Sequence, residues 1–153
     1  MNPATQPAGP RSLGPEVGVL NALLRSELAA VVTYEQALML FADRPPWNDL
    51  RSICEHHRSA AGVLRDQVVN LGGEPEAGAV SDFASPEERP PNSQIALDAL
   101  RAMEERRLAE IERVLEREQL PDECRFAIRA SVLPRCHEHI DMLAGLAARA
   151  RKG

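Results

Sequence analysis

Aromatic residues are scarce in this chain: tryptophan, tyrosine and phenylalanine together make up 3% of its 153 residues. Such a chain has little of the material that favours β-strands, whereas its many alanines and leucines favour helices. It contains only three cysteines, an odd number and too few for a disulfide scaffold, so we expect a reducing, cytoplasmic location. The composition therefore predicts an all-α protein of one domain, large enough to bury an ordinary core.

Long runs of basic or apolar residues are also missing. The net charge is −5 and no long basic segment is present, which argues against a nucleic-acid partner. The longest apolar run is far shorter than a membrane span, so we expect no membrane segment. Residues 1–14 carry neither a charged start nor an apolar run. We expect them to form a flexible tail rather than a signal peptide.

Prolines, glycines and capping residues divide residues 15–152, which we expect to form the single domain, into four helical segments. Pro15 suits a helix start and Gly72 a helix end. Pro134 is expected to kink the last helix or divide it into two pieces. The expected helices cover 15–43, 48–71, 93–118 and 121–151.

One connection, residues 73–92, is unusually long and is rich in proline, glycine, serine and glutamate. Long structureless loops are uncommon in compact domains and need a reason. Fully extended, this segment reaches about 66 Å, well beyond the roughly 35 Å length of the second helix. It can therefore cross the whole bundle and make the second and third helices parallel. Two hairpins joined by such a crossover form a ferritin-like four-helix bundle. The alternative is a linker between two half-domains, which would be poorly stable.

The four histidines and two of the three cysteines lie in two tetrapeptides, Cys-Glu-His-His at 54–57 and Cys-His-Glu-His at 136–139. Each contains Cys-x-x-His, and a spacing of three puts both side chains on one face of a helix. In the helical pattern of apolar residues, Cys54, His57, Cys136 and His139 all fall on the expected core faces. His56 and His137 lie one position away and are expected at a helix interface or on the surface.

The other two helices each interrupt their apolar face with one glutamate, Glu27 and Glu104. Glu104 lies 14 residues before 118, and His139 lies 18 residues after Pro121. At about 1.5 Å per residue, these two positions meet at nearly the same height across the hairpin. We therefore expect two glutamates, two cysteines and two histidines to converge at mid-bundle, with Glu105 on the solvated face.

Three segments resemble proteins of the ferritin-like superfamily, to which bacterioferritins and rubrerythrins belong. LNALLRSELAAVVTYEQAL at 20–38 resembles the first helix of bacterioferritins, and HEHIDMLAGL at 137–146 resembles their fourth helix. The stretch HRSAAGVLRDQVVNLGGEPE looks like the second helix of a group of small bacterial ferritin-like bundles. The likeness covers most of residues 16–147 and is weakest in the third helix.

The resemblance implies a dinuclear metal site. By it, Glu27, His57, Glu104 and His139 match metal ligands, and Tyr34 matches a residue that hydrogen-bonds those ligands. Cys54 and Cys136 stand where the family has the two glutamates that bridge the metals. This departure argues against carrying over iron oxidation or iron storage.

Replacing carboxylates by thiols changes the expected metal. Thiolate is a softer ligand than carboxylate, so the preference moves from iron towards zinc or copper. Cys54, His57, Cys136 and His139 could enclose one tetrahedral zinc ion. A dicopper centre with two bridging thiolates is the other arrangement. We expect a role in metal handling or redox chemistry.

Two other functions fit the same residues. Buried carboxylates facing buried imidazoles can form ion pairs without any metal, as in a purely structural or interaction bundle. Cys54 and Cys136 could instead act as a thiol redox switch through a disulfide.

The first helix is apolar over more than one face, which is typical of a subunit interface. We expect a homodimer formed through this helix. The apolar residues outside its core face are Leu23, Leu28, Val32, Met39 and Leu40.

Overall fold

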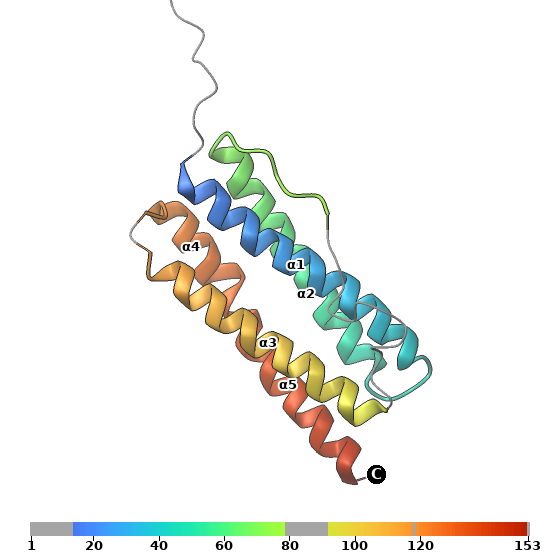
Figure 1. The fold of residues 1–153 in the computed structure, drawn as a ribbon. Helices are drawn as coiled ribbons and strands as arrows, with labels where there is room; N and C mark the ends of the chain where they lie inside the picture. The colour runs from blue at the N-terminus through green and yellow to red at the C-terminus, as the bar shows by residue number, and fades with distance from the viewer. Residues whose placement is uncertain (1–13, 79–91, 118, 153) are drawn as a thin grey trace, which may run out of the picture.

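The computed structural model describes residues 14–78, 92–117 and 119–152, and these residues contain helices and no strand. The helices are α1 (Pro15–Leu40), α2 (Trp47–Asn70), α3 (Ser93–Leu115), α4 (Asp122–Ser131) and α5 (Leu133–Lys152). They pack side by side as an elongated bundle, with α4 and α5 following one another along it (Figure 1). The prediction of an all-α bundle is confirmed.

The helix ends follow the local chemistry closely. α1 ends at Leu40, three residues before the expected end, because residues 41–43 form a turn in which Asp43 has a φ of 61°. Gly72 follows α2 with a φ of 79°, a left-handed conformation that favours glycine. Asn92 caps α3, and its side-chain oxygen accepts a hydrogen bond from the backbone N–H of Ile95 at 2.9 Å.

The fourth expected helix is divided, as Pro134 predicted. α4 ends at Ser131, Val132 is a turn residue with a φ of −108°, and α5 begins at Leu133. Proline has no N–H to donate to the carbonyl of Ala130, and its ring crowds that carbonyl. The break lies just before Cys136, so it places the start of the second tetrapeptide at the beginning of a new helix.

The apolar core forms two clusters along the bundle. One cluster joins the start of α1 to α4 and to the ends of α2 and α3. The other joins the end of α1 to α5 and to the starts of α2 and α3. α2 and α3 therefore run in the same direction, and α1 and α5 run in the opposite one (Figure 1).

The connection between α2 and α3 begins by running back along α1. The side-chain amide of Asn21 donates to the carbonyl of Glu74 at 3.0 Å and accepts from the N–H of Glu76 at 2.9 Å. Residues 79–91 lie outside the described part of the chain, so the rest of the expected crossover is not seen.

α1 is the most apolar helix. By length and composition alone it could span a membrane, and half of its most apolar stretch is buried inside the bundle, as in a core helix. Placing Leu23 outside the core was wrong: it is 3% exposed and packs in the first cluster. Met39 is 72% exposed, and Leu28, Val32 and Leu40 are half-buried.

Candidate metal centre

Four helices each place one polar side chain in the middle of the bundle. Glu27 comes from α1, His57 from α2, Glu104 from α3 and His139 from α5, and each is at most 4% exposed. Glu104 is fully buried, whereas the side chain of the neighbouring Glu105 is 53% exposed. The helical register predicted for these residues is confirmed.

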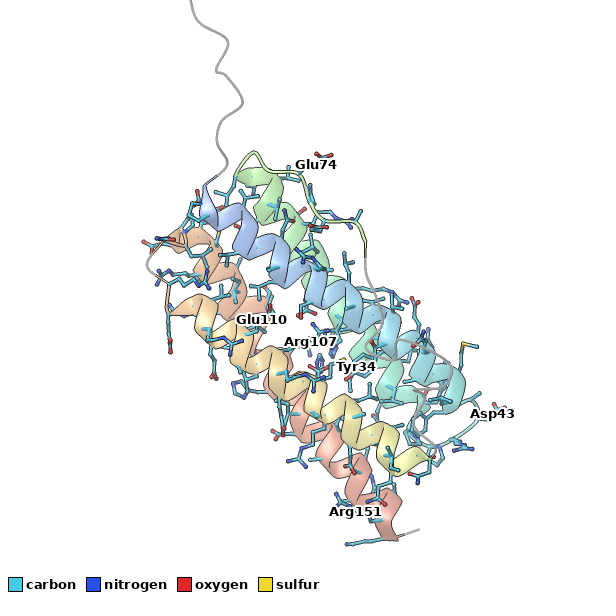
Figure 2. The ribbon with its side chains drawn as sticks, viewed as in Figure 1. Tyr34, Asp43, Glu74, Arg107, Glu110 and Arg151 are labelled. Carbon is cyan, nitrogen blue, oxygen red and sulfur yellow. The ribbon has the colours of Figure 1, made fainter. Side chains whose placement is uncertain are left out.

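Glu104 is the hub of this group. Its Oε1 accepts a hydrogen bond from the hydroxyl of Tyr34 at 2.7 Å and lies 2.7 Å from Nε2 of His57. Its Oε2 lies 3.6 Å from Nδ1 of His139. Figure 2 shows Tyr34 in the middle of the bundle, and its ring also stacks on His57 with centroids 5.3 Å apart. Tyr34 thus holds the carboxylate in place, and its role beside a metal ligand stays a prediction.

His57 lies between two carboxylates. Its Nδ1 is 2.5 Å from Oε2 of Glu27, and its Nε2 faces Glu104. Burial by itself lowers the pKa of His57, but the two carboxylates outweigh burial and raise this pKa to about 9. Burial likewise raises the pKa of Glu104, but His57 and His139 bring it well below its ordinary value. In the metal-free protein at neutral pH, His57 is therefore a cation held between the carboxyl groups of Glu27 and Glu104.

His139 is held on one side only. Its Nε2 shares a hydrogen bond of 3.0 Å with Nδ1 of His56, and the two rings stack at an interplanar angle of 9°. Its Nδ1 is buried and has no hydrogen-bond partner. When Nε2–H donates to His56, the lone pair of Nδ1 faces Oε2 of Glu104. Two ligand atoms that bind the same metal ion, each about 2.1 Å from it, lie roughly 3 to 3.5 Å apart. The separation of 3.6 Å between Nδ1 of His139 and Oε2 of Glu104 is close to that value.

Sequence reasoning left His56 out of the site. The structure makes it half-buried and the direct partner of His139. His56 lies in the same tetrapeptide as His57, and this is the feature of the sequence that could have identified it as part of the site. His137, by contrast, is exposed as expected.

The cysteines are all free thiols. The Cys136 thiol hydrogen-bonds the backbone carbonyl of Glu104 at 3.4 Å and lies 3.8 Å from Oε2 of the same residue. The Cys54 thiol faces the carbonyl of Val31 at 3.7 Å. Burial raises the pKa of both thiols, and for Cys136 the carboxylate of Glu104 raises it further. Both are neutral thiols in this state, and their role as metal ligands stays a prediction.

The residues closest to a metal-binding arrangement are His57, Glu104 and His139. One ligand atom from each lies within 4.8 Å of the others. A recess of about 10 Å³ adjoins them, lined in part by Glu27, His56 and Cys136. A space of this size holds roughly one water-sized body. Two imidazoles and one carboxylate are a ligand set that zinc and other divalent transition metals use.

Comparisons of the chain with protein-family models, with curated proteins and with solved structures gave no match.

Proposed function

We propose that this chain is a ferritin-like metal-binding protein that holds a transition-metal ion through His57, Glu104 and His139. The observation that carries the proposal is the convergence of three buried ligand side chains from three helices. The buried Nδ1 of His139 supports it further, because it has no hydrogen-bond partner and lies 3.6 Å from Oε2 of Glu104, so that one metal ion could join the two atoms. Glu27 and Cys136 adjoin the three ligands and could complete a second metal position.

The ligand set favours zinc or copper over iron. Nitrogen-containing sites bind copper and zinc more tightly than ferrous iron in the usual divalent order. Cys136 lies within reach of the same carboxylate and adds a soft ligand when it loses its proton. A bound ion would supply Lewis-acid or redox chemistry at the centre of the bundle, in metal handling or electron transfer.

The ferritin-like assignment rests on two kinds of support. The segments at 20–38 and 137–146 resemble bacterioferritin helices. In addition, α2 and α3 run in the same direction, as a long crossover at 73–92 requires.

A structural bundle is the competing function. It is favoured by the ion pairs of His57 with Glu27 and Glu104, which satisfy both ring nitrogens without a metal. Such buried pairs hold the helices in one register even where their net stabilisation is small.

Metal content separates the two functions. Protein purified without an affinity tag should contain transition metal, measured by elemental analysis, and should bind zinc, copper and ferrous iron in anaerobic titrations. A content below about a tenth of an equivalent, together with no binding in the titrations, would leave the structural bundle as the function.

Single substitutions test the ligands. Glu104→Gln should weaken metal binding about tenfold or more, because it removes the central anionic ligand. The matched control Glu105→Gln, one residue along α3 on the solvated face, should bind like the original chain. Equal affinities in the two variants would contradict the proposed site.

The thiols are tested separately. Cys54→Ser and Cys136→Ser keep the size of the side chain but cannot supply a thiolate. If the thiols ligate, each change should weaken zinc and copper binding sharply. Tight iron binding that survives both changes would show a conventional carboxylate and imidazole site and overturn the preference for zinc or copper.

A further inference from the structure

A pocket of about 480 Å³ lies between α1 and α3, and none of the expected metal ligands lines it. Ser26 and Ala29 line it from α1, and Arg106, Arg107 and Arg113 line it from α3. Figure 2 shows Arg107 and Glu110 in the space between these two helices. Its volume is in the range of small-molecule sites.

Arg107 is the unusual residue of this pocket. It is 5% exposed, its Nη1 donates a hydrogen bond to the hydroxyl of Ser26, and its Nε is buried without a hydrogen-bond partner. A guanidinium is always charged and carries five N–H donors in a fixed fork. Because a buried cation without a counter-charge is costly, this side chain calls for an anionic partner.

The part of the chain that the structure describes supplies no such partner. Its recorded ion pairs include none to Arg106, Arg107 or Arg113. Glu110 is the single carboxylate in the lining, so three arginines and one glutamate leave the pocket a formal charge of +2. The whole chain, in contrast, carries −5. The pocket is therefore a local positive site on an acidic protein.

We propose that this pocket binds a small organic anion by its phosphate or carboxylate group. Arg107 lines the pocket and carries the planar fork that suits bidentate recognition of an oxyanion, and the exposed Arg106 and Arg113 add charge at the rim. Ala29 and Met103 give the pocket an apolar side that fits the organic part of the ligand. The proposal does not depend on the metal, although Arg107 lies one helical turn from Glu104.

Titration of the full-length, metal-free chain with inorganic phosphate and, separately, with succinate tests the proposal. Calorimetry at low ionic strength should show binding of at least one of them. Binding of phosphate alone assigns a phosphorylated ligand, and binding of succinate alone assigns a carboxylate ligand. Amide NMR shifts should change at 26–29 and 103–113. No binding of either anion up to about 10 mM would overturn the proposal.

Matched variants locate the binding. The double change Arg106→Gln and Arg113→Gln removes two exposed rim charges and should weaken binding about tenfold or more. Arg65→Gln with Arg129→Gln removes the same charge from exposed positions on α2 and α4 and should have little effect. Equal weakening by the two double variants would show a nonspecific response to net charge and would overturn the site.

Arg107→Lys provides a second check, because it keeps the charge but loses the planar fork. Anion affinity should fall in this variant while its helical circular dichroism stays unchanged. Unaltered affinity in the folded variant would exclude Arg107 as the anchor.

Discussion

Glu104 shows how one residue can organise a core. Its two oxygens contact side chains from three other helices: Tyr34, His57 and His139. It also accepts the thiol of Cys136 through its backbone carbonyl. A buried carboxylate is tolerated in this position only because cationic and N–H or O–H groups surround it. The same concentration of ligand atoms makes it the central residue of the candidate metal site.

His56 is expected to act through His139. Its Nδ1 can accept the Nε2–H of His139 and so leave Nδ1 of that ring free to bind a metal. Loss of such an orienting partner typically costs about 10- to 100-fold in metal affinity. We therefore expect His56→Ala to weaken zinc binding by about that factor in competition titrations, with the unfolding transition little changed.

His137→Ala is the control for this prediction, since His137 lies in the other tetrapeptide and is exposed. It should bind zinc like the original chain. If His56→Ala binds zinc equally well, His56 does not orient the ligand.

At the scale of elements, the end of α2 packs tightly against the start of α1. Gly73 follows α2 and leaves no room for a side chain: an added Cβ would lie 2.6 Å from Cγ1 of Val17 and 3.1 Å from Cγ1 of Val68. Gly62, within α2, has no atom within 4 Å of the same position. The two glycines therefore have opposite roles in one hairpin.

Alanine substitution should separate these roles. Gly73→Ala should lower the free energy of unfolding by about 1–3 kcal/mol, because Val17 and Val68 must move. Gly62→Ala should raise it by about 0.5–1 kcal/mol, because alanine is the better helix former. Equilibrium urea unfolding measures both. A neutral or stabilising Gly73→Ala would contradict the close packing of this junction.

At the scale of the whole molecule, the central ion pairs make stability depend on pH. The folded pKa of His57 is about 9, against 6.5 in the unfolded chain. The contribution of His57 to the free energy of unfolding is therefore complete below pH 6.5 and is lost as the pH rises to 9. Glu104 has a lowered pKa, so its contribution is present above its ordinary value of 4.5 and is lost as the pH falls.

Metal-free protein should therefore be most stable between about pH 4.5 and 6.5. Between pH 6.5 and 9 the free energy of unfolding should fall by up to about 1.4 kcal/mol per pH unit from His57 alone. Urea unfolding at several pH values, with a chelator present, measures this slope. In His57→Gln the alkaline slope should be much flatter; an unchanged slope would show that another group is responsible.

The homodimer through α1 is a further prediction for the whole molecule. Met39, on α1, is 72% exposed, and Phe126, on α4, is 75% exposed. A charge placed in a buried interface opposes association because it must be desolvated. We expect sedimentation velocity to show a dimer that Met39→Lys dissociates and that Phe126→Lys leaves intact. A monomer at all concentrations would exclude the dimer, and dissociation by the second variant alone would move the interface to α4.

Periodicity and local chemistry were enough to predict the helices and most of their core faces, although not the burial of Leu23. The side chains on one face of a helix repeat at a fixed angle, so the pattern alone identified Glu27, His57, Glu104 and His139 as buried and Glu105 as exposed. The break near Pro134 also follows from a single residue. These features depend on interactions within a few positions of the chain.

The contacts between helices depended on the tertiary structure. Which of two neighbouring side chains meets a partner depends on how each helix is rotated and how far apart the axes lie, and neither is encoded in the spacing of one helix. Packing thus brought His56 to His139, directed Cys54 to the carbonyl of Val31, and buried Arg107 beside a pocket. It also set the pKa of His57, because that value reflects two carboxylates from other helices. The sequence alone determined most of the residues that face the core, although not Leu23 or Arg107; their distances and charges required the folded bundle.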